Sequence, residues 1–551
     1  MEKLLHGDGL GPQQAGLLAA FSLLALVTFS KYSVFRGKTD VPYPPGPKPR
    51  FFWGNALDIP TVKPWVKYSE WSRQFNSDIL HMTALGTHII VLQNRGDAIA
   101  LLEKRSSQYS NRPFVPIFDL LDMKENTVVI QYGEMWRQQR RILQHHFKAG
   151  AISQYQSVQL EKVHGLLYNL LNTPENFYSH CKKAVAAISL AVTYGHEMGT
   201  DENDYLYRVA ELTAKAAEEL SMPGRTLINL LPFLKYIPSW FPGATIQREA
   251  ADVRKVADVY KNRPYDSLKK DLATGIANPC MLSKILEQQE KLGNMAVEER
   301  VVKEAIATVY LAGAETTADV TLMFLMAMAL HPDVAKKAQK ELDRVVGLER
   351  LPTLEDREAL PYLEAIIREV LRWNPVTPLA FPHSVTQDDV YKGYRIPKGA
   401  IIFPNVWAMM HDESRYKDPG KFIPERFFQD DGTLNDDRVD IIFGFGRRCG
   451  LSEGQPHVRR SHMPSVSSLH SQCLGQHFGL STLWIIVASV LACFDISPAK
   501  DEEGKDIPID KNNITSGIVC HILPFKCSIK PRSRRAAELI LSLHEDTKSA
   551  R

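Results

Sequence analysis

Apolar side chains recur at helical spacing through most of the chain between residues 130 and 375, and this pattern predicts a mainly helical protein. Helices are expected over 134–147, 155–172, 205–220, 248–271, 299–330, 333–346 and 361–373. Strand-like runs are few and short, at 79–93, 389–403 and 518–529. The sequence therefore predicts a mainly α fold with small β-sheets, of the α+β class.

The longest uncharged run lies near the N-terminus, from Gly9 to Ser30. Spanning a bilayer takes about 20 apolar residues, and Lys31, Arg36 and Lys38 follow the run, which favours a cytoplasmic body. We expect a membrane anchor at 1–38, a proline-rich hinge at 39–49 and the main body of the protein at 50–551. The alternative is a cleaved signal peptide. The apolar, proline-broken stretch 222–243 is either a core loop or a second contact with the membrane.

Composition narrows the class of protein. The 551 residues carry 66 Lys and Arg against 63 Asp and Glu, a net charge of +3, so no nucleic-acid partner is expected. With 44% hydrophobic residues and one long apolar run, the chain is neither disordered nor polytopic. Its seven cysteines form no C-x-x-C pair, which argues against a disulfide framework or a structural zinc site.

Two separated motifs suggest a buried ion network. Glu369 and Arg372 lie three residues apart on the predicted helix 361–373, a spacing that places both on one face. Such a pair alone is most often a solvated salt bridge. The loop FIPERF at 422–427 adds Arg426, whose guanidinium would need a carboxylate partner if it were buried. Glu369 is the candidate partner.

The segment LAGAETT at 311–317 suggests an acid and an alcohol inside the long predicted helix. Threonine hydroxyls can bond to the carbonyl four residues earlier, which can widen a helix and leave a groove. Glu315 beside Thr316 in such a groove could relay protons to a bound oxygen ligand. The plainer alternative is an ordinary helix with one exposed glutamate.

Two further motifs indicate a bound anionic group and a metal. Trp136 and Arg140 lie one helical turn apart and are donors without acceptors, although a basic surface helix is the plainer reading. FGFGRR at 443–448 contains Arg447, and CLGQHFG begins at Cys473. A thiolate just before a helix, next to glycines that permit close backbone approach, is well placed to bind a metal.

Together and in this order, these motifs resemble those of the cytochrome P450 family of haem-thiolate monooxygenases, over the whole chain. The resemblance implies haem b with Cys473 as the iron ligand, and Trp136, Arg140 and Arg447 at the haem propionates. It implies that Glu315 and Thr316 deliver protons. It also implies that Glu369, Arg372 and Arg426 form a structural network behind the haem.

The resemblance further implies insertion of one oxygen atom from O2 into an apolar small molecule. Since the chain shows no flavin or dinucleotide motif, electrons would come from a separate NADPH-cytochrome P450 reductase. The body would sit on the cytoplasmic face of the endoplasmic reticulum membrane, held by one span. Alternatives are a haem-thiolate isomerase that needs no O2, and a haem-deficient, inactive membrane protein. The implied substrate pocket draws on 114–121, 222–231, 309–312, 376–381 and 516–519.

One departure from the family pattern is large. The family has a single residue between the second arginine and the cysteine, whereas 24 residues separate Arg448 from Cys473. Cys449 follows Arg448 directly, but the residues after it do not open a helix, so Cys473 is the preferred ligand. Residues 449–471 are an atypical insertion, either a translated, unspliced intron or a genuine insertion.

Overall fold

The structure is a computed structural model that describes residues 41–198, 204–221, 226–229, 231–293, 297–446 and 473–549. The predicted anchor at 1–38, Arg447, Cys449 and the segment 449–471 lie outside the described residues. Nothing in the structure therefore tests those assignments.

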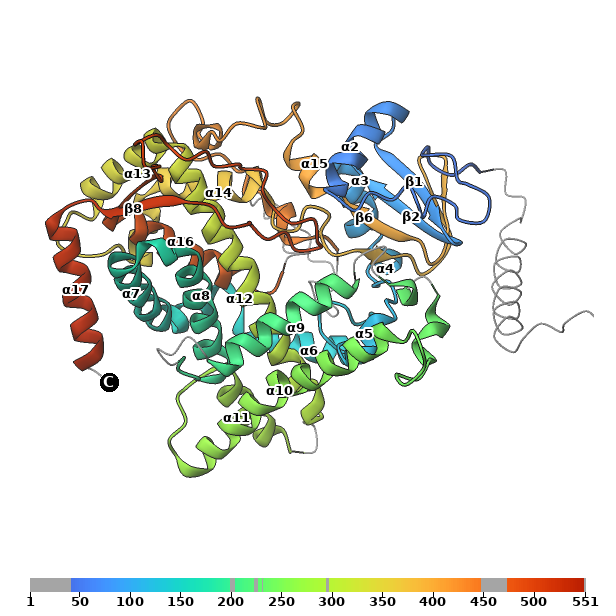
Figure 1. Ribbon diagram of the computed structural model, residues 1–551, viewed down its shortest axis with the longest axis horizontal. Coiled ribbons are helices and arrows are strands. Elements are labelled where there is room, and N and C mark those ends of the chain that lie inside the picture. The colour runs from blue at the N-terminus through green and yellow to red at the C-terminus, as the bar shows by residue number, and fades with distance from the viewer. Residues whose placement is uncertain are drawn as a thin grey trace, which may run out of the picture.

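Helices make up most of the described chain (Figure 1). They are α2 Pro64–Phe75, α3 Arg95–Ala98, α4 Ser106–Tyr109, α5 Ile117–Leu120, α6 Glu134–His146, α7 Gln156–Asn172, α8 Phe177–Tyr194, α9 Tyr205–Ser221, α10 Thr245–Thr274, α11 Met281–Leu292, α12 Glu299–Leu330, α13 Pro332–Val345, α14 Pro361–Trp373, α15 Val406–Met410, α16 Gln476–Cys493 and α17 Arg534–Ser549. The mainly α expectation is confirmed.

The sheets are small, as predicted. The strands are β1 Ile79–Ala84, β2 Thr87–Leu92, β3 His383–Ser384, β4 Asp389–Tyr391, β5 Tyr394–Ile396, β6 Ile401–Pro404, β7 Phe494–Pro498 and β8 Cys527–Pro531. One sheet has the order β1-β2-β6-β3, with β2 and β6 parallel and the other pairs antiparallel. Two further two-stranded antiparallel sheets, β4-β5 and β7-β8, are separate from this one.

The helix α12 runs through the centre of the helical body. It packs against α8, α6, α16, α10 and α14, and residues 321–329 are all buried. Both α12 and α16 are long and apolar enough to cross a membrane, but 56% and 78% of their apolar windows are buried inside the protein. Burial on all sides explains their uniformly apolar composition, so we regard both as core helices.

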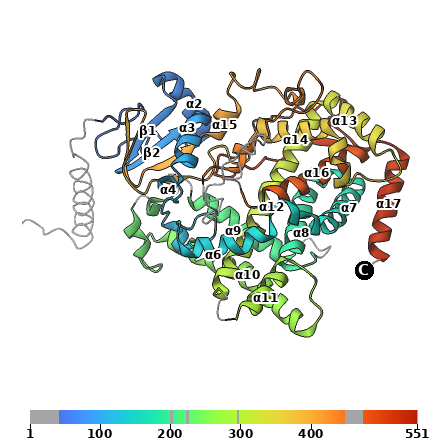
Figure 2. The same cartoon turned by 180° about the vertical axis from the view of Figure 1, so that it is seen from behind.

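The sheet and the helical body occupy different ends of the molecule. In Figure 1 and in the reverse view of Figure 2, β1, β2 and α2 lie at one end and α17 lies at the other. The proline-rich segment is bound to the sheet rather than projecting from it. The backbone N–H of His81 donates to Pro45 O at 3.0 Å, that of Arg395 donates to Pro42 O at 2.8 Å, and the Tyr43 ring stacks on His81.

The predicted helices match the observed ones within a few residues at each end. The strand prediction for 518–529 is wrong for most of its length, because only Cys527–Pro531 pairs as a strand. The backbone of the preceding segment bonds elsewhere: Cys520 N–H donates to Val376 O, and His521 N–H to Thr515 Oγ1. The helices α2, α8, α11 and α17 lie outside the predicted segments. Most of α8 is buried, so it lacks the polar face on which periodicity depends.

Candidate active site

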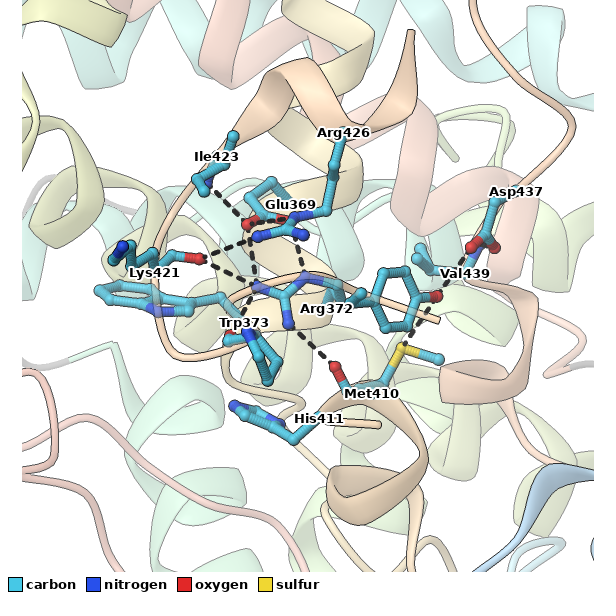
Figure 3. Close-up of polar contacts among 12 residues, drawn as sticks. Glu369, Arg372, Trp373, Met410, His411, Lys421, Ile423, Arg426, Asp437 and Val439 are labelled. Atoms are coloured by element: carbon cyan, nitrogen blue, oxygen red, sulfur yellow. Dashed lines mark hydrogen bonds and ion pairs between the residues drawn. The ribbon is translucent and has the colours of Figure 1, made fainter. Parts of the chain in front are cut away.

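Glu369 and Arg372 form a wholly buried ion pair on α14 (Figure 3). Arg372 donates from Nε and Nη2 to the two carboxylate oxygens of Glu369 at 2.7 and 2.8 Å. Its Nη1 donates to Met410 O at 2.9 Å, and Nη2 also donates to Pro419 O at 3.0 Å. A buried pair is stable only when its remaining donors and acceptors are bonded, and here the carbonyls of the following loop bond them.

Arg426 completes this network from the 3₁₀ turn Pro424–Phe427. Its Nε donates to Glu369 Oε1 at 3.1 Å, and the backbone N–H of Ile423 donates to the same oxygen at 2.8 Å. The contact predicted between Arg426 and Glu369 is therefore present, across 57 residues of sequence. The network fixes the loop after α15 onto α14, and its predicted role in haem incorporation stays a prediction.

The middle of α12 is more open than the rest of that helix. Ala312 is exposed and its neighbours Leu311 and Gly313 are partly exposed, whereas residues 304–308 and 321–329 are buried. The Thr316 hydroxyl donates to Ala312 O at 2.9 Å, the bond expected to the carbonyl four residues earlier. The helix nevertheless stays α-helical from Glu299 to Leu330, so the expected widening is not seen.

Glu315 lies on a different side of α12 from this hydroxyl contact. It lines a small, partly open pocket between α8, α9, α12 and the segment around His521. Burial raises the pKa of its carboxyl to about 7, while the positive charge of His521 opposes that rise. A carboxyl with this pKa both gains and loses a proton near neutrality. Among the described residues, no hydrogen bond joins Glu315 to Thr316.

Trp136 and Arg140 are both buried on α6, which packs against α12. The Arg140 guanidinium carbon lies 5.8 Å from the centroid of the Trp136 ring. The predicted pairing of an indole N–H with a guanidinium is thus present inside the protein rather than on a surface helix. Buried donors of this kind suit an anionic ligand, because a carboxylate accepts hydrogen bonds and cannot donate them.

Cys473 lies at the start of the last core helix, beside the glycine-rich turn. Its backbone N–H donates to Phe443 O at 3.0 Å, and its carbonyl accepts from Gln476 N–H at the first turn of α16. Gly446 has φ +91°, and a Cβ there would lie 2.8 Å from Leu102 O, so only glycine fits. Gly446 thus permits a close backbone approach to Leu102, and the approach of these glycines to a bound metal stays a prediction.

The packing of α16 on α12 brings these groups to one region. A Cβ on Gly479 would lie 3.7 Å from Thr317 Oγ1, so α16 contacts α12 at the LAGAETT segment. With Trp136 and Arg140 on α6, which also packs on α12, the surroundings of α12 include a thiol, a buried indole N–H and a buried guanidinium. These groups fit a haem: the thiolate would bind the iron, and the buried donors would bind the anionic propionates. The Glu369 network belongs to α14 and the turn Pro424–Phe427, and Arg447 lies outside the described residues.

The implied substrate segments also converge in part. Ile117 and Leu121 pack with Leu220 of α9 and with Leu311 of α12 in one apolar cluster. The backbone of Ile117 also bonds to the Asn229 side chain at 3.2 Å, and Cys520 N–H donates to Val376 O at 2.7 Å. The residues of this cluster are apolar and buried, which fits the apolar pocket that the resemblance implies.

One cluster escaped the sequence-based prediction. His521 lies between Glu218 and Asp319, which are 303 and 202 residues away in sequence. Spacing along the chain gives no signal for such a contact, because each residue comes from a different structural segment. The only available signal is weak: charged residues inside otherwise apolar helices need partners.

The comparisons with known proteins agree with this geometry. The family model for cytochrome P450 matches residues 44–450 and ends where the segment 449–471 begins. A cytochrome P450 monooxygenase of Armillaria gallica is 37% identical over 513 residues, covering 92% of this chain and 95% of its own length. One from Postia placenta is 35% identical, covering 92% and 94%. Tryptamine 4-monooxygenase of Psilocybe cyanescens is 35% identical, covering 89% and 93%.

Proposed function

The chain belongs to the cytochrome P450 family of monooxygenases, and on that premise we propose that it inserts one oxygen atom of O2 into an apolar organic substrate. The observation that carries the proposal is the position of Cys473, which precedes α16 where that helix contacts the LAGAETT segment of α12. The apolar cluster of Ile117, Leu121 and Leu220 supports an apolar substrate.

The family implies a haem, and we propose haem b held by Cys473, with Trp136, Arg140 and Arg447 at its propionates. When bound, a thiolate-ligated haem supplies the electronic push that favours O–O cleavage. The protein's own part is to hold the thiolate at the start of α16 and to place buried donors on α6. In this proposal, Glu315 stores a proton near neutral pH, and Thr316 orients the acceptor of that proton.

A spectrum tests the assignment of the ligand. Thiolate ligation gives the reduced carbon monoxide complex a red-shifted Soret band, which other ligands do not give. Cys473→Ser should abolish this band, and Cys449→Ser should leave it. The reverse result would assign the ligand to Cys449, and no haem band in either variant or in the parent would favour the haem-deficient reading.

Proton delivery is tested by coupling. Thr316→Ala should keep haem and substrate binding but divert electrons to peroxide or water. Equal amounts of product per NADPH in the variant and the parent would reject the role of Thr316.

We also propose that electrons come from a separate NADPH-cytochrome P450 reductase and that the protein is held on the endoplasmic reticulum membrane with its body in the cytoplasm. Exposed aromatic side chains of the turn 232–241, namely Phe233, Tyr236, Trp240 and Phe241, support a second membrane contact. Deleting residues 1–38 should weaken membrane attachment and keep the haem. Full retention on membranes would reject the single anchor.

Residues 449–471 are proposed to be a translated intron. The backbone N–H of Cys473 donates to Phe443 O at 3.0 Å, so the two ends of the interrupted loop lie side by side and a much shorter loop can join them. Deleting 449–471 should raise haem loading, and sequencing of the messenger RNA should find the shorter form. Abundant peptides from 462–472 in the native protein would show a genuine insertion.

A further inference from the structure

The cavity beside Glu315 is lined by charged side chains from four parts of the chain. We call it the α12 cavity, and it lies between α8, α9, α12 and the segment around His521. Lys182 comes from α8, Glu211 from α9, Glu315 and Asp319 from α12, and His521 from the C-terminal segment. Glu218 of α9 bonds to His521 just beside it. Four carboxylates therefore face one lysine and one histidine, and the region has more negative than positive groups.

His521 bonds to carboxylates with both ring nitrogens. Nδ1 lies 2.8 Å from Asp319 Oδ2, and Nε2 lies 2.9 Å from Glu218 Oε2. Two carboxylate acceptors are both satisfied only if the ring carries a proton on each nitrogen, so the geometry favours an imidazolium. Burial alone would lower the pKa of His521, but hydrogen bonds to Asp319 and Glu218 outweigh burial and raise the pKa to about 10.

The surrounding structure is shaped to allow this double contact. A Cβ on Gly517 would lie 1.5 Å from Glu218 Oε1, so the carboxylate occupies space that any other residue would fill. Asp319 is 1% exposed, and its Oδ1 is buried without a hydrogen-bond partner among the described residues. Within the described chain, His521 is therefore the residue whose side chain bonds to the Asp319 carboxylate.

Glu315 is within electrostatic range of this cluster. Burial is the main reason why the pKa of its carboxyl is raised. The charges of His521 and Lys182 lower this pKa, and those of Asp319 and Glu218 raise it further. The phenols of Tyr207 and Tyr310 also face Glu315 and stay neutral, since burial raises the pKa of each. His521 and Glu315 both line the α12 cavity, and Asp319, which bonds to His521, lies one helical turn after Glu315 on α12.

We propose that His521 is a positioning residue that supplies the compensating positive charge for Glu315, and so sets the pH range over which Glu315 holds a proton for the reaction. The proposal rests on the function proposed above, in which Glu315 delivers protons. His521 itself does not touch the reacting atoms. It acts through the α12 cavity, where its charge offsets those of Asp319 and Glu218.

The physical consequence concerns the proton on Glu315. Without the imidazolium, Glu315 would face Asp319 and Glu218 with only Lys182 to offset them. Like charges nearby disfavour ionisation, so Glu315 would keep its proton to a higher pH. A cation in place of the imidazolium would preserve the balance, whereas a neutral side chain would not.

The experiment measures the protonation of Glu315 through stability, which does not depend on turnover. The free energy of unfolding is measured against pH for the full chain and for Glu315→Gln, and the difference between them reports the titration of Glu315. The same pair is then compared in a His521→Gln background and in a His521→Lys background. In His521→Gln the inflection should move up by about one pH unit, and in His521→Lys it should stay near that of the parent.

A second measurement separates this proposal from the proposed function. The pH profile of product formed per NADPH should move in the same direction in His521→Gln, and this shift should vanish when Glu315→Gln is added. His164→Gln, a histidine of α7 that does not line the cavity, should move neither curve.

An unmoved stability inflection in His521→Gln would overturn the proposal. An inflection that moves while the coupling profile stays fixed would also overturn it, and would remove Glu315 from proton delivery. If the parent shows no thiolate-type carbon monoxide band, the proposed function fails whatever the inflection does.

Discussion

Two buried ion networks in this protein use the same kinds of side chain and are built in opposite ways. In the Glu369–Arg372–Arg426 network, each carboxylate oxygen accepts at least one hydrogen bond and loop carbonyls take the remaining donors (Figure 3). In the α12 cavity, Glu315 has no hydrogen-bond partner among the described residues, and Asp319 keeps one buried oxygen unbonded.

The difference shows how the same charges serve two purposes. A network in which every group is bonded holds its charges constant, because losing a proton or a partner is costly. A cluster with too few partners and some open space has charges that respond to pH. The first suits a structural support, and the second suits a site that stores a proton.

The largest effect should come from breaking the bonded network. Glu369→Gln leaves two buried guanidinium groups facing a neutral amide, and we expect a loss of about 3–5 kcal/mol in the free energy of unfolding. Chemical denaturation with intrinsic tryptophan fluorescence measures this. A loss below about 1 kcal/mol would show that the network is not a structural support.

Replacing the carboxylate in the α12 cavity should stabilise the protein above pH 7, whereas replacing Glu369 destabilises it. Burial raises the pKa of Glu315 to about 7 in the folded protein, above its usual value of 4.5, so the folded state holds the extra proton and stability falls as pH rises from 4.5 to 7. Glu315→Gln removes this fall. Above pH 7 the variant should be more stable than the parent, on the order of 2–3 kcal/mol, and near pH 4 the two should match. Equal stability at pH 8 would contradict this.

A smaller effect is expected from crowding the cluster. Gly517→Ala places a Cβ against Glu218 Oε1 and should pull that carboxylate from His521, with a loss of about 1–2 kcal/mol. The loss should shrink as pH rises toward 10, since a raised histidine pKa contributes stability only while the folded ring stays charged. Gly150→Ala is the matched control, because nothing lies within 4 Å of its Cβ position.

The smallest effect should come from an ordinary surface pair. Glu287 and Lys291 bond at 2.8 Å with 63% and 73% of their side chains exposed. Glu287→Gln should leave the free energy of unfolding unchanged within the error of the measurement, because both partners are solvent-exposed. A change comparable to that of Glu369→Gln would mean that burial is not what separates the two networks above.

The Glu369–Arg372–Arg426 network could be predicted from the sequence, whereas the charged cluster in the α12 cavity could not. Arg426 could be assigned to Glu369 because a buried guanidinium needs a carboxylate, and the E-x-x-R helix offered one. No such requirement pointed from His521 to Asp319, since histidine is compatible with a loop, a core or a surface. Residues 518–526 failed as a strand for a related reason. The backbone of Cys520 bonds to Val376, more than 100 residues earlier, and that of His521 bonds to the Thr515 side chain; a local strand pattern carries no information on either contact.

The docking of Tyr43 has a mechanical consequence. Its ring stacks on His81 at 4.6 Å and His88 at 5.1 Å, and a Cβ on Gly46 would lie 2.0 Å from His81 O. The segment around Tyr43 is thus held rigidly against the β1–β2 sheet. A rotation of the chain at residue 41 would therefore rotate the sheet with it. Any tether attached before this point would fix the orientation of the whole body as well as its distance.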